Sequence, residues 1–117
     1  MAYDEGLVAW VQEGLEPLGT VTMRKMMGAA TLYLDGTIFA VADDQLWFKS
    51  DSESDAVWDE AGCERFTFTS KDGRVEVMNY RRAPDAAYDD ADELQRWARL
   101  AVEAGQRGAA KRRPKKG

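Results

Sequence analysis

The residues of this chain that could do chemistry are carboxylates, one thiol and a cluster of bases. The sequence contains no histidine, so a serine–histidine–aspartate triad, a cysteine–histidine pair and histidine-ligated metal sites are excluded. The one cysteine, Cys63, lies among acidic residues, and nearby negative charge disfavours the thiolate. We therefore interpret Cys63 as a structural thiol in preference to a nucleophile.

Paired carboxylates are the remaining candidates, because they could act as general acids and bases or bind a hard cation. Each pair, however, lies where a turn, an exposed helix face or a helix N-terminus already accounts for it. The pairs are Asp43-Asp44, Asp59-Glu60, Asp89-Asp90 and Asp92-Glu93. No phosphate-binding loop or dinucleotide fingerprint accompanies them. We expect a protein that is not an enzyme and takes no metal or cofactor; a small carboxylate-based enzyme is the weaker alternative.

Charge is distributed unevenly along the chain. The net charge is -5 from 16 bases and 21 acids; six of those bases and no acid lie in residues 107–117, so residues 1–106 carry -11. Such a tail could bind nucleic acid weakly and in a salt-sensitive way. The acidic body opposes this, and no aromatic residue lies among the bases for stacking. We expect a solvated tail, with nucleic-acid binding as the alternative, through Lys111, Arg112, Arg113, Lys115 and Lys116.

The elements that would position a binding surface begin with a predicted three-strand meander. Asp35-Gly36 separates Ala29–Leu34 from Thr37–Ala42 and predicts a two-residue type I′ turn. Asp43-Asp44 is expected to be a second two-residue turn, leading into Gln45–Lys49. The predicted cross-strand pairs are Leu34 with Thr37, Leu32 with Phe39, and Val41 with Leu46.

This register sorts the strands into two faces, because opposed residues share a face. The expected core face holds Ala30, Leu32, Leu34, Phe39, Val41, Leu46 and Phe48. The other face is mixed and holds Thr31, Tyr33, Ile38, Ala40, Trp47 and Lys49. We expect Tyr33, Ile38 and Trp47 to contact a protein partner or a second copy in a homodimer; a covering helix is the alternative.

The other elements follow from hydrophobic periodicity and turn signals. They are a helix at Asp4–Leu18, an extended segment at Thr20–Lys25, a helix at Asp51–Ala61, a hairpin of Arg65–Ser70 and Arg74–Tyr80 turning at Asp72-Gly73, a loop at Arg81–Pro84, and a helix from Asp90 to about Ala104. The two hairpins are expected to join into one antiparallel sheet. The predicted fold is α+β, in the order helix, three-strand meander, helix, β-hairpin, helix, with one domain over residues 1–106 and a disordered basic tail over 107–117.

The order of several short motifs resembles that of a known family. The first is Arg24-Lys25-Met26-Met27-Gly28-Ala29, followed by Leu34-Asp35-Gly36 and Phe39-Ala40; further matches lie at Leu46 to Lys49, Glu60-Ala61-Gly62, Phe66, Met78 to Tyr80, Pro84, Asp90 to Leu94 and Trp97. Together they resemble the N-terminal domain of the TfoX/Sxy family over roughly residues 3–104. Met27 stands where the family typically has an aromatic residue, and Ala29 where it has a second glycine.

This resemblance implies an α+β domain without catalytic residues. It also implies a role in the regulation of natural competence and transcription, in part through partnership with a cyclic-AMP receptor protein. Longer members carry a second domain, whereas this sequence continues into the basic tail. We expect a regulatory or protein-binding module of unknown partner, located in the cytoplasm, because no apolar run approaches the length of a membrane span and Met1–Leu18 is acidic.

Overall fold

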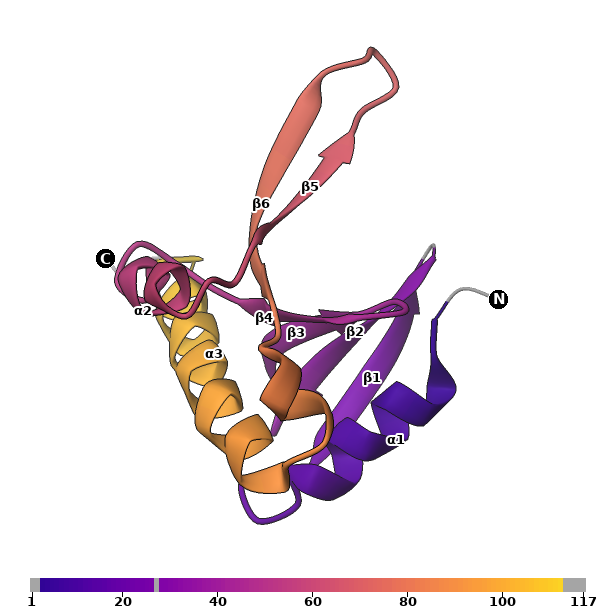
Figure 1. The fold of residues 1–117 in the computed structure, drawn as a ribbon, viewed down its shortest axis with the longest axis vertical. Coiled ribbons are helices and arrows are strands. Elements are labelled where there is room, and N and C mark those ends of the chain that lie inside the picture. Colours follow the sequence, from indigo (N-terminus) through magenta and orange to yellow (C-terminus); the bar gives the residue numbers. More distant parts are fainter. Residues whose placement is uncertain (1–2, 27, 113–117) are drawn as a thin grey trace, which may run out of the picture.

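The computed structural model describes residues 3–26 and 28–112, which form a two-layer α+β fold (Figure 1). Its six strands make one antiparallel sheet in the order β1-β2-β3-β4-β6-β5 within this described part. The predicted fold class and the joining of the two hairpins into one sheet are confirmed. The elements are α1 (Glu5–Gly14), β1 (Val21–Met26), β2 (Ala29–Leu34), β3 (Thr37–Ala42), β4 (Leu46–Lys49), α2 (Asp55–Glu60), β5 (Arg65–Thr69), β6 (Val75–Arg82), the 3-10 helix η1 (Asp85–Tyr88) and α3 (Ala91–Arg112).

The first helix is shorter than predicted. Asp4 caps α1, since its side chain accepts a hydrogen bond from the Leu7 amide at 3.1 Å. The helix ends at Gly14 rather than Leu18, and the following residues form a turn. Pro17 disfavours helical geometry in the residue before it, which accounts for the earlier end.

The turn between β2 and β3 is as predicted, but the register changes beyond it. Asp35 and Gly36 have φ values of 48° and 86°, as a type I′ turn requires, and Leu34 pairs with Thr37. A β-bulge then places Leu32 opposite Ala40. The predicted pairing of Leu32 with Phe39 is therefore wrong, because Phe39 is the extra residue of the bulge.

The loop between β3 and β4 also differs from the prediction. Ala42 pairs with Leu46, so the loop has three residues and not two, and the Gln45 amide donates to the Asp43 carboxylate at 2.8 Å. The bulge and the extra loop residue each shift the register by one position and cancel. Leu46 therefore still faces the core.

The predicted core face is largely confirmed in spite of these shifts. Leu32, Phe39 and Phe48 are all 0% exposed and belong to one cluster. Two residues exchange places because of the bulge: Val41 is only half-buried on the outer face, whereas Ala40 is fully buried in the core. The predictions for Val41 and Ala40 were therefore wrong.

Helices α1 and α3 cover the core face of the sheet (Figure 1). The ring of Trp58 stacks on Phe48 at a centroid distance of 5.7 Å and contacts Trp97 at 5.1 Å, so α2 seals the core beside α3. At Gly105 the α3 backbone lies so close to β3 that an added Cβ would collide with the Ile38 carbonyl oxygen.

The last helix is longer than predicted. It runs through Gly105 to Arg112, whereas the sequence suggested an end near Ala104. The absence of a side chain at Gly105 permits the close approach to β3. The predicted boundary of the tail at residue 107 therefore falls inside α3, and residues 113–117 lie outside the described part of the chain.

The β5–β6 hairpin rises from the sheet on the side away from α1 and α3 (Figure 1). Its turn has three residues, because the Ser70 amide donates a hydrogen bond to the Arg74 carbonyl. Gly73 in this turn adopts a φ of 85°. Arg81 and Arg82, predicted to be in a loop, belong to β6. β6 pairs with β4 only through its last three residues, 80–82, so the outer part of the hairpin projects beyond β4.

Candidate functional site

A cavity of about 200 Å³ lies between the outer face of the sheet and the base of the β5–β6 hairpin. The sheet and the hairpin each contribute one wall. The wall residues that matter most are Ala29, Val41, Trp47, Phe66, Met78 and Tyr80. We call this cavity the outer groove.

Trp47 is the central residue of the outer groove. Its neighbours in register are Val41 on β3 and Arg82 on β6. Its ring meets Phe66 edge-on, at a centroid distance of 4.9 Å and an interplanar angle of 73°. The indole nitrogen donates to the Asp43 carboxylate at 3.2 Å. The ring therefore has a satisfied polar end and an apolar body that is only half-buried, as anchor residues of binding surfaces do.

The hairpin wall is partly exposed. Met78 exposes 41% of its surface. The ammonium of Lys49 lies over the Tyr80 ring, 5.2 Å from its centre. The groove thus presents flexible and aromatic apolar groups next to a cation and one carboxylate, which suits the binding of an apolar side chain.

The structure separates the three residues expected to form the partner surface. Tyr33 and Ile38 are paired across β2 and β3 and are half-buried. Tyr33 borders a different depression, beside Thr22 and Arg24 on β1. Trp47 lies in the outer groove with residues from the hairpin.

Sequence reasoning missed Phe66, Met78 and Tyr80 as neighbours of Trp47. Met78 and Tyr80 are two residues apart on one strand, which was a signal that they share a face. Their approach to Trp47, however, depends on how the hairpin is set on β4.

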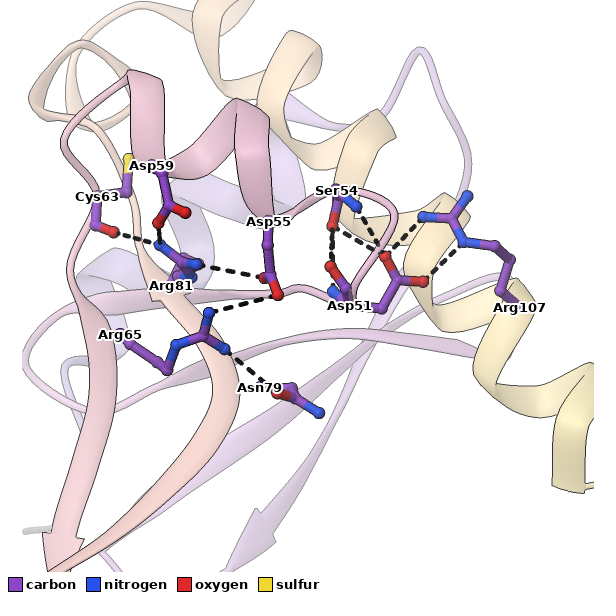
Figure 2. A network of polar contacts seen from close by, with 9 residues as sticks. All are labelled: Asp51, Ser54, Asp55, Asp59, Cys63, Arg65, Asn79, Arg81 and Arg107. Atoms are coloured by element: carbon purple, nitrogen blue, oxygen red, sulfur yellow. Dashed lines mark hydrogen bonds and ion pairs between the residues drawn. The ribbon is translucent and has the colours of Figure 1, made fainter.

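A second feature that sequence reasoning missed is the polar network around Arg81 (Figure 2). The Arg81 residue is only 2% exposed. Its guanidinium donates to Asp59 at 2.6 Å, to the Cys63 carbonyl at 2.9 Å and to Asp55 at 3.3 Å. These bonds join β6 to both ends of α2. The network is therefore a structural support for the base of the hairpin.

Arg65 extends this network to the edge strand. Its guanidinium pairs with Asp55 at 3.3 Å and donates to Asn79 at 3.3 Å (Figure 2). Asp55 thus receives one arginine from β5 and one from β6. These ion pairs connect α2 to both strands of the hairpin.

Asp51 and Arg107 form the second half of the network. The Arg107 side chain donates twice to Asp51, and Ser54 donates to the same carboxylate at 3.0 Å from its hydroxyl (Figure 2). The hydrogen bonds from Arg107 lower the pKa of Asp51 to about 2, although burial opposes this. The same contact raises the pKa of Arg107.

Cys63 is buried, and burial raises the pKa of its thiol. The physical cause differs from the one expected, because the charges that act on the thiol are those of Arg81 and Arg82, which lower its pKa. Desolvation outweighs them. The prediction that the thiolate is disfavoured is confirmed, but not the prediction that acids cause it.

Several of the paired acids have hydrogen-bond partners within the fold, and two of the predicted nucleic-acid residues lie on α3. Asp43 holds the Trp47 indole, Asp59 holds Arg81, and Asp90 caps α3 through the Asp92 amide at 2.9 Å. Lys111 and Arg112 belong to the last turn of α3. The remaining predicted nucleic-acid residues, Arg113, Lys115 and Lys116, lie outside the described range.

Across residues 3–26 and 28–112, no group of three or more acids or cysteines is placed to hold a metal ion. Within the same part of the chain, every helix is too short or too polar to cross a membrane.

Comparison with known proteins identifies the family. The sequence model of the TfoX N-terminal domain matches residues 13–105, which is most of the chain. This protein therefore belongs to the TfoX N-terminal domain family. A search of curated proteins gives no match.

Proposed function

We propose that this protein is a non-catalytic module that binds an apolar side chain of another protein in the outer groove. The observation that carries the proposal is the groove itself, where Trp47 on the sheet and Phe66 and Met78 on the hairpin line a space of about 200 Å³. Pockets that enclose small-molecule ligands typically measure about 300–1,000 Å³. A smaller apolar space lined by aromatic residues fits a protein anchor better.

The same proposal assigns the module to the regulation of transcription or natural competence. Membership of the TfoX N-terminal domain family supports this assignment. In such a role the module acts by holding a partner, so that a contact surface is needed and a reactive centre is not.

The positions of the acidic residues support a non-catalytic role. Asp43 is occupied by the Trp47 indole, Asp59 by Arg81, and Asp90 by the first amides of α3. These carboxylates come from separate parts of the fold and have structural partners. General acid–base catalysis would instead need carboxylates that converge on one substrate position.

The experiment uses a phage-displayed library of random peptides, selected on the full chain. We expect enriched peptides to share a bulky apolar residue. Met78→Glu is the test variant, because Met78 borders the groove and is exposed enough to be replaced without unfolding the protein. This variant should bind the synthesised peptides with an affinity lower by about tenfold or more, as expected for the loss of an anchor contact.

Val57→Glu is the matched control. Val57 lies on α2, outside the groove, and is 44% exposed, close to the value for Met78. This variant should bind the peptides as the wild type does in isothermal titration calorimetry. Failure to enrich any peptide, or equal loss of affinity in both variants, would contradict the proposal.

A second proposal, nucleic-acid binding, is favoured by the run of bases at residues 111–116. Arg107 is held by Asp51 and is therefore not part of a free basic segment. A chain that ends at residue 110 keeps that ion pair and lacks the bases at residues 111–116. Fluorescence anisotropy with DNA should show weak, salt-sensitive binding that this truncation abolishes. Unchanged binding after truncation would contradict this second proposal.

A further inference from the structure

The two edges of the sheet differ in how they are protected. In the described part of the chain, β1 and β5 are the terminal strands. Exposed sheet edges tend to pair with other strands, and proteins prevent this with charged residues, prolines or bulges. β1 carries Arg24 and Lys25, which are both exposed, so this edge is protected by two cations.

The β5 edge lacks comparable protection. Its sequence, Arg-Phe-Thr-Phe-Thr, favours strands and contains neither proline nor acid. Its only charge is at Arg65, which is neutralised within the molecule by Asp55. The irregularity in its pairing with β6 is also confined to the Arg65 end. Thr67 and Thr69 are exposed and uncharged.

The hairpin that carries this edge has little support of its own. Its outer part extends beyond β4 and away from the helices (Figure 1). Val75 and Met78 on β6 expose 69% and 41% of their surfaces. A two-stranded hairpin alone is marginally stable in water, and a third strand is what usually makes it stable.

We propose that β5 pairs with β5 of a second copy of this chain, antiparallel and around a two-fold axis at Thr67. Thr67 is the middle residue of the strand, so this register pairs all five positions. It places Thr67 opposite Thr67 and Arg65 opposite Thr69, and no like charges are directly opposed.

A second copy fits this edge better than a strand of another protein. Each copy supplies an edge that complements itself, which is the requirement for a two-fold interface. The projection of the hairpin also keeps the helical layers of the two copies apart (Figure 1). Phe66 on β5 lines the outer groove with its side chain, whereas the proposed pairing uses the backbone edge of β5, so the dimer presents two grooves.

Charge variants at Thr67 test the register in sedimentation-velocity experiments on the full chain. The wild type should be a dimer that dissociates on dilution. Thr67→Lys or Thr67→Glu alone should weaken the dimer by about tenfold, because like charges would meet on the axis. An equal mixture of the two variants should associate again. Thr22→Lys, at an exposed threonine of the β1 edge, is the control and should dimerise like the wild type.

Disulfide trapping is the second measurement, and it does not depend on charge. Thr67→Cys in a Cys63→Ser background should form a covalent dimer under mild oxidation, because facing strand residues have Cα atoms at about the separation of a disulfide. Thr22→Cys in the same background should not.

Three results would overturn the proposal. They are a wild type that stays monomeric at all concentrations, a Thr67→Lys protein that dimerises like Thr22→Lys, and a mixture of oppositely charged variants that stays monomeric. None of them depends on the outer groove, so peptide binding and dimerisation can fail independently.

Discussion

Asp51 receives two hydrogen bonds from the guanidinium of Arg107, at 2.7 Å from Nε and 2.9 Å from a terminal nitrogen. This pair ties the segment between β4 and α2 to the end of α3. Because Ser54 also donates to Asp51, the same carboxylate orders the start of α2. Arg107 is thus a residue of the domain and not of a tail.

Removing the Arg107 side chain should lower the unfolding free energy at neutral pH. It should also reduce the amount by which the unfolding free energy falls when the pH is lowered. The pKa of Asp51 is about 2 in the folded chain against an ordinary 3.8. Its contribution is therefore present above pH 4 and is lost as the pH falls towards 2. Arg107→Gln should lower the unfolding free energy by about 1 kcal/mol, a value reduced for solvent screening. Urea titrations at pH 7 and pH 3 measure both effects.

Glu53→Gln is the control for this experiment. Glu53 approaches the same guanidinium at 3.2 Å, but its side chain is 63% exposed. We expect a change below about 0.5 kcal/mol. If Arg107→Gln lost as much stability at pH 3 as at pH 7, the ion pair would not be the cause.

The buried arginine of the network should matter more than its exposed partner. Arg81→Leu removes three hydrogen bonds from a side chain that is 3% exposed, and it should lower the unfolding free energy by about 2 kcal/mol. Asp59→Asn changes a side chain that is 67% exposed and should cost about 1 kcal/mol or less. Thermal unfolding followed by circular dichroism compares them; equal losses would argue against a structural role centred on Arg81.

Gly105→Ala tests the close approach of α3 to β3. Alanine is favoured over glycine inside a helix by about 1 kcal/mol. Here, however, the added Cβ would collide with the carbonyl oxygen of Ile38, which is backbone and cannot move away easily. We expect a net loss of stability of about 1–3 kcal/mol. Gln106→Ala, at the exposed neighbouring position, should be nearly neutral in the same urea titration.

The thiol of Cys63 should react slowly in the folded protein. Burial raises its pKa, so less thiolate is present at a given pH than for a free cysteine. Alkylation by iodoacetamide at pH 8 should be about tenfold or more slower than in urea, where the thiol is solvated. Equal rates in both conditions would contradict the burial of this residue.

The apolar face of β2 could be predicted from the turn that follows it. Asp35-Gly36 defines a type I′ geometry by residue type alone. The bulge at Phe39 could not be predicted in the same way. Residues 38–42 are all apolar, so alternation does not distinguish one register from the next. The third loop residue, Gln45, then compensates for the bulge, so that Leu46 and Phe48 were placed correctly by an incorrect register.

The site was only partly predictable, because its residues come from segments that are far apart in the sequence. Trp47 was identified as a large aromatic residue on a mixed face. Its neighbours Met78 and Tyr80 come from a hairpin whose position depends on the β4–β6 pairing. Arg81 was predicted to lie in a loop that runs to Pro84. Its burial depends on Asp55 and Asp59, more than 20 residues earlier in the sequence, and local patterns carry no information about such partners.

The position of α3 at the end of the element order has a consequence for synthesis. This helix covers β3 and β4, yet it is translated after every strand is complete. Until it leaves the ribosome, the side chains of Leu32, Phe39 and Phe48 have no helical cover from that side. In a nascent chain of this protein, the apolar face of β3 and β4 therefore stays uncovered by α3 until that helix has emerged.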